Sequence, residues 1–220
     1  GAKTSGTVTV TNAVAISGTL AQVTAALVTE SSKVTAGTAV VTISDADDAA
    51  LDAAVLYAIG AKTSGTVTVT NAVAISGTAT ECTAALVTDI SKVVAGKTGT
   101  TATISNAVNV AEGSAIAQVN NITAIFSGGI SDSRSNLADS GSITANLTNC
   151  KNEDGDVAIT ISDADDTAMT AADLSAIGSA TSGTVTVTNA VAISGSSTEC
   201  TAALVTADTL VVLDDATVTI

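Results

Sequence analysis

The 220-residue chain contains no histidine, proline or tryptophan, and it has only three cysteines. Without histidine it offers no imidazole general base, and three widely separated cysteines form no cysteine–histidine metal site. The longest apolar runs, such as 53–59, fall far short of the ~20 residues that a membrane-spanning helix needs. These absences argue against an enzyme, a zinc protein and an integral membrane protein.

Basic residues are also scarce, with seven Lys and Arg against 21 Asp and Glu and a net charge of −14. This charge has the wrong sign for binding the phosphate backbone, so we expect no nucleic-acid partner. Because 46% of the residues are hydrophobic and only 13% are charged, the chain is expected to fold rather than to be disordered. The composition is typical of secreted and surface repeat proteins.

The chain repeats its own sequence at a fixed period. Residues Ala2–Thr19 and Ala61–Thr78 are identical and lie 59 positions apart. Ser182–Gly195 repeats part of the same sequence, 118 positions after Ser64. A second pair of similar segments, Val41–Gly60 and Ile159–Gly178, is also separated by 118 positions. Such self-similarity is the sequence signature of a repeat architecture.

A smaller unit lies inside this period, because an Asn or Asp closes each strand-like run. The closing residues are Asn12, Asp45, Asn71, Asn106, Asp132, Asp163 and Asn189, and their successive separations are 33, 26, 35, 26, 31 and 26 positions. We therefore predict seven coils, short and long in alternation, each with one strand and one short helix. We expect the Asn and Asp side chains to serve a structural role, bonding their own turns and stacking along the strands.

Alternating Thr and Val predicts the strands, with Val directed into the core and Thr directed outward, as in residues 7–11. Capping-box motifs predict helices that begin after Thr19, Thr78 and Ser196, each with Gln or Glu three residues later. In the short coils, the acidic residues at 45–48 and 163–166 are expected to begin the helices, where negative charge complements the helix dipole. The predicted core comprises Val8, Val10, Leu20, Val23, Leu27, Leu56, Ile59, Val67, Val69, Leu86, Leu174, Ile177, Val185, Val187 and Leu204.

These elements predict an α/β fold, a right-handed parallel solenoid of about seven coils that spans residues 1–220 as a single domain. An all-β parallel β-helix is the alternative, if the helical segments are loops. The middle copy, about 107–156, has diverged from the repeat. We expect helices there at 114–120 and 133–139, followed by an added turn at 150–156.

Cysteines take two kinds of position. Cys82 and Cys200 occupy identical contexts in which the first copy has Val23, so we predict buried free thiols. Two periods of the repeat separate these two cysteines, which is too far for a disulfide. Cys150 lies in the divergent turn, where it could be exposed.

The acidic clusters are the only metal-like features of the sequence. Asn152, Asp154 and Asp156 resemble the start of a calcium loop with Gly155 between them, but no downstream bidentate Glu follows. We therefore name these three residues as the candidate calcium ligands. No other cofactor is expected, and no catalytic or cofactor-binding residues are identified, because the remaining carboxylates recur at equivalent places in the repeat.

With the repeats laid out, SGTVTVTNAVAISGT followed by TECTAALVT resembles the tandem repeats of giant bacterial, particularly cyanobacterial, cell-surface and extracellular proteins. Such proteins are described as adhesin-like or S-layer-like, and the resemblance covers most of the chain outside 107–156. It implies an extracellular structural or adhesive role. Similar repeats could also serve in a phage fibre.

The two ends of the sequence match interior positions of the repeat, because Gly1 corresponds to Gly60 and Ile220 corresponds to Ile43. We therefore expect either a window from a longer rod or subunits that stack end to end through their strand edges, so that the partner is a further copy of the chain. The expected function is that of an extracellular structural repeat protein that forms or belongs to a fibre, filament or surface layer. The alternative is a surface-binding module that depends on calcium or, through its interrupted Thr-x-Thr rows, on ice.

Overall fold

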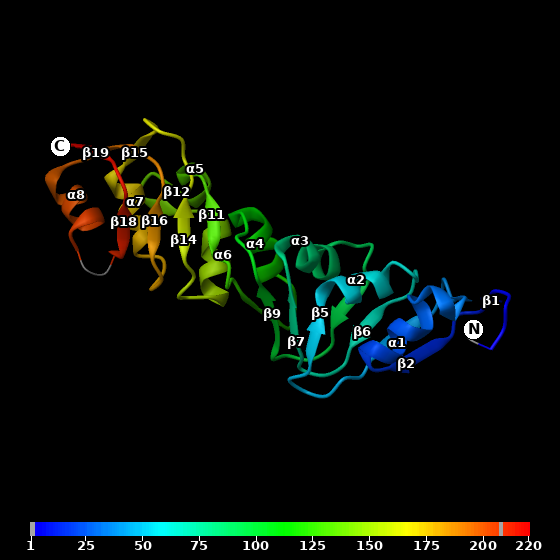
Figure 1. Ribbon diagram of the computed structural model, residues 1–220. Coiled ribbons are helices and arrows are strands. Elements are labelled where there is room, and N and C mark those ends of the chain that lie inside the picture. The colour runs from blue at the N-terminus through cyan, green and yellow to red at the C-terminus, as the bar shows by residue number, and fades with distance from the viewer. Residues whose placement is uncertain (1–2, 207–208) are drawn as a thin grey trace. The chain divides into compact units, whose positions relative to one another are not determined.

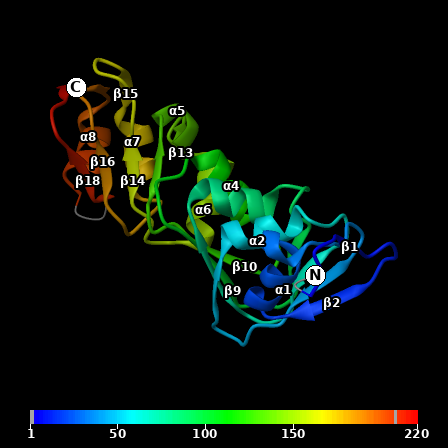
Figure 2. The same ribbon diagram turned by 45° about the vertical axis from the view of Figure 1, so that its right-hand side comes forward.

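The computed structural model describes residues 3–206 and 209–220, and the chain divides into two compact units (Figures 1 and 2). Unit 1 comprises residues 1–103 and 118–123, and unit 2 comprises residues 104–117 and 124–220. Each unit combines short helices with sheets that are mostly parallel. The predicted α/β class is therefore confirmed, and the all-β alternative is wrong.

Helices are short and follow the strands in a regular order. Their bounds are α1 Leu20–Leu27, α2 Ala53–Gly60, α3 Ala79–Cys82, α4 Val110–Ala117, α5 Arg134–Leu137, α6 Ala145–Glu153, α7 Ala171–Gly178 and α8 Ser197–Leu204. A 3₁₀ turn, η1, covers Glu30–Ser32, and α3 continues as a π-helix, η2, over Thr83–Val87. Within the described residues, none of these helices has the length and apolar character required to cross a membrane.

Strands of two to five residues alternate with these helices. In unit 1 and at its boundary they are β1 Val8–Thr9, β2 Ala15–Gly18, β3 Val34–Thr35, β4 Val40–Ile43, β5 Ala50–Asp52, β6 Val67–Val69, β7 Ala74–Gly77, β8 Val93–Ala95, β9 Thr100–Ile104 and β10 Ile122–Ile125. In unit 2 they are β11 Ile130–Asp132, β12 Ala138–Asp139, β13 Ser142–Ile143, β14 Ile159–Ile161, β15 Ala168–Thr170, β16 Val185–Val187, β17 Ala192–Ser194, β18 Val211–Leu213 and β19 Thr217–Thr219.

Parallel strands pair at a nearly regular step along the sequence, which is 26 positions within two rows of three successive strands. In unit 1, β4, β6 and β8 pair in succession, so that Val41 faces Val67 and Val67 faces Val93. In unit 2, β14, β16 and β18 form the corresponding row, in which Ile159 faces Val185 and Val185 faces Val211. Figure 1 shows this second row as three adjacent arrows next to α7 and α8.

The prediction of one strand per coil is wrong, because each short gap contains two strands, such as β5 and β6, and each long gap contains three, such as β2, β3 and β4. Val8 does not pair with the strand at Val41, 33 positions later, but with Val34, 26 positions later. β2 takes the place beside β4, with Ile16 opposite Val41. Pairing at this shorter step leaves the extra residues of each long gap to form further strands of their own.

The core consists of aliphatic side chains from the inner faces of the strands and helices. Val41, Ile43, Val67 and Val69 have an exposed fraction of 0%, whereas Thr68 between the two valines is half-buried. The predicted inward valines and outward threonines are therefore confirmed in these rows. Eleven of the fifteen predicted core residues are buried, namely Val23, Leu27, Leu56, Ile59, Val67, Val69, Leu86, Leu174, Ile177, Val185 and Val187.

Four predicted core residues are not buried, and all four lie in the first or last repeats. Val8 is 37% exposed, while Val10, Leu20 and Leu204 are half-buried. β1, for example, is paired on one side only, with β3. A core residue in such a strand lacks the neighbouring layer that buries its interior equivalents.

All three predicted capping boxes are present. Thr19, Thr78 and Ser196 each accept a hydrogen bond from the backbone N–H three residues later, and the Gln or Glu side chain at that position accepts from the cap's own N–H. Each motif satisfies two backbone donors at the helix start, which stabilises a helix by about 1 kcal/mol. This explains why such short helices form at fixed places in the repeat.

We expected the acidic residues of the short coils to begin the helices that follow them, and this prediction is wrong. α2 is capped by Asp52, and α7 by Thr170, several residues after the acidic clusters. Asp45 instead accepts a hydrogen bond of 2.6 Å from the N–H of Leu20, the first residue of α1 in the preceding repeat. Asp163 does the same for Arg134 at the start of α5.

The Asn positions of the repeat also link neighbouring repeats. The side-chain amide of Asn71 donates to the carbonyl of Asp45, and that of Asn189 donates to the carbonyl of Asp163, each 26 positions earlier. The structural role of these residues is thus supported by hydrogen bonds between repeats, and Asn106 and Asp132 also bond within their own turns, to the carbonyl of Ala107 and the N–H of Ser133. Similar amide bonds stabilise stacked strands in other β architectures.

The divergent middle segment differs most from its prediction. α4 begins at Val110 rather than at 114, α5 is a single turn, and β12 and β13 form an antiparallel strand pair. The added turn expected at 150–156 is wrong in its first half, because residues 150–153 belong to α6. Cys150 consequently lies inside the helix, three residues after the buried Leu147, and is itself fully buried.

Candidate functional site

The three candidate calcium ligands lie at the end of α6 in unit 2. Asn152 is in the last turn of the helix, and Asp154 is the residue that caps its C-terminus. Asp154 and Asp156 line a hollow of about 270 Å³ together with residues 125–127, 157 and 158. Asn152 does not line this hollow, so the structure brings together two of the three predicted ligands.

Asp154 is already engaged by the protein. One of its carboxylate oxygens accepts a hydrogen bond of 2.6 Å from the backbone N–H of Phe126. Burial of the carboxyl raises its pKa above the ordinary value; the Phe126 hydrogen bond opposes this rise, and the neighbouring Asp156 adds to it. A cation bound between the two carboxylates would relieve both unfavourable effects.

No larger acidic cluster supports this pair. Among residues 3–206 and 209–220, no three Asp, Glu or Cys side chains are grouped as metal binding requires. Calcium prefers six to eight oxygen ligands, of which Asp154 and Asp156 could supply only part. The remaining ligands would be backbone carbonyls and water, so calcium binding at Asp154 and Asp156 stays a prediction.

A second hollow in unit 2, of about 330 Å³, is lined mainly by polar side chains of the divergent segment. The lining residues are Asn109, Val110, Ala111, Asp132, Ser135, Asn136, Thr144 and Asn146. Several of its polar groups bond each other: Asp132 accepts from the N–H of Val110 at 3.0 Å and from the amide of Asn136 at 2.7 Å. These bonds hold the starts of α4 and α5 together.

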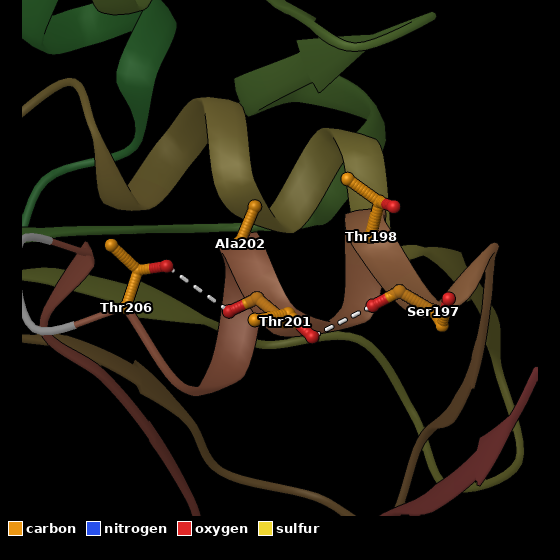
Figure 3. Close-up of a pocket in the computed structure, with 5 residues that line it drawn as sticks. All are labelled: Ser197, Thr198, Thr201, Ala202 and Thr206. Carbon is orange, nitrogen blue, oxygen red and sulfur yellow. Dashed lines mark hydrogen bonds between the residues drawn. The ribbon is translucent and has the colours of Figure 1, made fainter.

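The hollow shown in Figure 3 lies along α8 and encloses about 390 Å³. Its hydroxyls serve the helix itself, since Thr201 donates to the carbonyl of Ser197 and Thr206 donates to the carbonyl of Thr201 (Figure 3). Thr24 of α1 and Thr29, which follows that helix, make the corresponding bonds in the first repeat. We interpret this surface as a recurring feature of the repeat helix rather than as a unique site.

One buried ion pair was not foreseen in the sequence. Arg134 contacts Asp173 with an Nη1–Oδ2 distance of 3.1 Å, and the Asp173 side chain is 2% exposed. Asp173 also accepts a hydrogen bond from the N–H of Gly141, while the buried Nε of Arg134 has no partner. The signal was available, because Asp173 occupies the position of Val55 in the earlier copy, 118 positions before it.

The three cysteines are free thiols and all are buried. This confirms the prediction for Cys82 and Cys200, whereas the prediction that Cys150 is exposed is wrong. Burial raises the pKa of Cys150 to about 12 and that of Cys82 to about 11, so neither thiol ionises near neutral pH. Such thiols are poor nucleophiles and poor metal ligands.

Comparison of the chain with protein-family models, with curated proteins and with solved structures found no match.

Proposed function

We propose that this chain is an extracellular structural repeat protein that forms or belongs to a long fibre, filament or surface layer. In this proposal the repeats wind as a right-handed parallel solenoid, and the rows of paired strands run along its axis. The function is then mechanical continuity, supplied by the hydrogen bonds between successive repeats.

The observation that carries the proposal is the in-register pairing of core residues at a step of 26 positions in one row of three strands in each unit. Val41, Val67 and Val93 follow one another across adjacent strands in unit 1, and Ile159, Val185 and Val211 do so in unit 2. Such a ladder has no intrinsic length, because each repeat presents the same edge to the next.

Contacts outside the strands support the same interpretation. The bonds from Leu20 to Asp45 and from Asn71 to Asp45 join consecutive repeats through side chains that recur in the sequence. Thr24 and Thr201, which occupy equivalent places in two long-coil helices, each donate to a carbonyl of their own helix. The residues that recur in the repeat thus make contacts that join consecutive repeats into a continuous structure.

The proposal is tested by negative-stain electron microscopy across a range of protein concentrations, with and without a calcium chelator. We expect filaments or rods that lengthen with concentration. X-ray diffraction from oriented material is expected to show a reflection near ~4.8 Å along the fibre axis, from strands stacked perpendicular to it. Single particles of one chain at every concentration, with no such reflection, would contradict the proposal.

The second candidate is a surface-binding module of the adhesin type that depends on calcium. The observation that favours it is the hollow that Asp154 and Asp156 line at the end of the divergent segment, where the two carboxyl groups interact with each other. Calorimetric titration with calcium tests this function, with Asp156→Asn as the variant. Equal heats for the two proteins would exclude a site at this pair.

A further inference from the structure

The two units differ sharply in charge. Unit 1 has five Lys against seven acidic residues, for a net charge of −2, whereas unit 2 has two basic residues against 14 acidic ones, for a net charge of −12. Charges of opposite sign on different surfaces favour specific contacts between proteins. The lysines of unit 1 and the excess carboxylates of unit 2 are therefore compared below as the two sides of one contact.

Three lysines of unit 1 lie in turns that lead into strands. Lys33 and Lys92 directly precede β3 and β8, and Lys62 lies between α2 and β6. Lys33 and Lys62 line one hollow of about 220 Å³. Gly60, at the end of α2, lies so close to the carbonyl oxygen of Ser91 that the turns of Lys62 and Lys92 are brought together. We name Lys33, Lys62 and Lys92 the lysine row.

The chain does not neutralise the lysine row. All three residues are exposed, and no ion pair within residues 3–206 and 209–220 includes any of them. Glu30 and Asp89 lie three positions before Lys33 and Lys92, but neither is within ion-pair distance of the row. The ammonium group of Lys33 donates to the carbonyl of Ser5 at 2.8 Å, which leaves it further N–H donors.

The fold does not require lysine in these turns. In the last copy, 118 positions later, Ala180 stands in the place of Lys62 and Leu210 in the place of Lys92. The backbone is nevertheless the same, since φ is 53° at Lys92 and 45° at Leu210. The lysines of unit 1 therefore supply positive charge rather than a backbone conformation.

Unit 2 carries negative charge in the turns that follow its strands. Asp165 and Asp166 follow β14, and Asp214 and Asp215 follow β18 of the same sheet. All four residues are exposed. Asp165 accepts a hydrogen bond from the N–H of Ala190, and we name the other three the acidic edge.

The equivalent turns of unit 1 contain their own cation. There Lys97 contacts Asp47 with an Nζ–Oδ2 distance of 2.8 Å. In unit 2, 118 positions later, Asp165 corresponds to Asp47, and Asp215 corresponds to Lys97. No ion pair of the described residues reaches these turns of unit 2. The acidic edge therefore lacks the positive charge that its counterpart in unit 1 has.

We infer that the lysine row of one copy binds the acidic edge of a second copy, so that neighbouring copies associate side by side. Both sets of charges adjoin strands of parallel sheets, so they recur at multiples of about 4.8 Å on the two surfaces. Because the two surfaces differ, each copy keeps one of them free for a further copy, and the association can continue. This inference rests on the proposed fibre or surface-layer function and specifies a lateral contact within it.

The salt dependence of association is the first test. Sedimentation is measured at increasing NaCl concentration, with EDTA present so that no divalent cation bridges the acidic edge. We expect association at ~20 mM NaCl that weakens at least about tenfold at ~300 mM, because salt screens exposed ion pairs.

Neutralising the lysine row is the second test. The triple variant Lys33→Gln/Lys62→Gln/Lys92→Gln should weaken association about tenfold, since each exposed ion pair contributes modestly. The matched control changes the net charge equally, through three exposed residues in the first turns of α1, α3 and α8: Ala21→Glu/Thr80→Glu/Thr198→Glu. Negative charge stabilises a helix start, so the control should fold, and it should weaken association less than about threefold.

Exchange of the charges is the third test. One variant makes the lysine row acidic (Lys33→Glu/Lys62→Glu/Lys92→Glu), and a second makes the acidic edge basic (Asp166→Lys/Asp214→Lys/Asp215→Lys). Each variant alone presents two surfaces of the same sign and should not associate. In an equal mixture every contact joins opposite charges, so association should return, while circular dichroism verifies that both variants are folded.

Each outcome decides the inference. Association that returns in the mixture, together with a clear difference between the Gln variant and its control, supports it. Association that is independent of salt, equal behaviour of the Gln variant and its control, or a mixture that does not associate overturns it; binding of wild-type protein, but not of the Gln variant, to dextran sulfate would then assign the row to an acidic polymer. Filaments that form without lateral association overturn the inference and leave the fibre function standing, whereas the absence of both counts against both.

Discussion

Replacing Gly60 with alanine tests the packing between α2 and the following repeat. Gly60 is the last residue of α2, and a Cβ atom placed there would lie 1.8 Å from the carbonyl oxygen of Ser91. Ser91 is held in place, because its hydroxyl donates to the carbonyls of Ala85 and Thr88 and its side chain is buried. The helix and the Ser91 backbone can approach this closely only where no side chain intervenes.

Two effects of opposite sign act on this substitution. Helix propensity alone favours alanine over glycine by up to about 1 kcal/mol. Against this, contacts of Cβ atoms below 3.0 Å essentially do not occur, so the Ser91 oxygen must move well away from its 1.8 Å position. Overpacking of this kind typically costs about 1–3 kcal/mol, and we expect Gly60→Ala to destabilise the fold by about 2 kcal/mol.

The assay is urea denaturation followed by circular dichroism, with hydrogen exchange measured over residues 88–95. Gly37→Ala is the matched control, since no atom lies within 4 Å of its Cβ position. It should be neutral or stabilising by up to about 1 kcal/mol, through the lower entropy of the unfolded chain. A Gly60→Ala protein as stable as the wild type, with unchanged exchange near Ser91, would refute the close approach.

Three further predictions concern the core, one carboxyl group and the thiols. Val69→Asp buries a charge without a partner and should lower the free energy of unfolding by about 4 kcal/mol or more, whereas Thr68→Asp on the outer face should lower it by less than about 1 kcal/mol. Equal melting temperatures of the two variants would reject the inward orientation of Val69. The pKa of Asp154 is raised in the folded state, so its contribution to stability is complete below the ordinary pKa of 3.8 and is lost as the pH rises through the folded-state pKa. The Asp154→Asn variant should not show this loss of stability, which is checked by comparing its melting temperature with that of the wild type across the acidic pH range. Cys150 should not react with a thiol reagent near ~pH 8 until the protein is denatured, and rapid labelling of the native protein would show that the thiol is accessible.

Features that depend on a few adjacent residues could be predicted from the sequence. The capping boxes at Thr19, Thr78 and Ser196 are of this kind, since the motif and the bonds that it makes involve only close neighbours in the chain. The orientation of Val67 and Val69 followed from alternation for the same reason. Local chemistry determines these features almost regardless of the rest of the chain.

Features that depend on contacts between different repeats were predicted less successfully from the sequence. Asp45 was expected to begin the helix that follows it, but its carboxylate bonds the helix of the preceding repeat. Nothing near Asp45 in the sequence distinguishes these two partners. The partner of β1 was misjudged in the same way, because the long gap contains two strand-like segments and only the three-dimensional arrangement of the coils selects Val34.

The candidate site illustrates a different limit. Cys150 lies among the polar residues Asn149, Lys151 and Asn152, so composition suggested an exposed turn. Its spacing of three from Leu147 places it on the inner face of a helix, and both side chains are fully buried. Helical periodicity was therefore the better guide here, and it also separates Asn152 from the hollow that Asp154 and Asp156 share.

The divergence of the middle segment has a physical consequence for where a specific ligand could bind. A contact that recurs along the repeat, such as the bond from Asn71 to Asp45 or from Asn189 to Asp163, must serve what the repeats have in common. The Arg134–Asp173 ion pair replaces an apolar position of the earlier copy with a buried charge that its partner stabilises. A site that recognises one specific ligand is therefore to be sought in unit 2, at the hollow that Asp154 and Asp156 line, because the sequence there is not repeated.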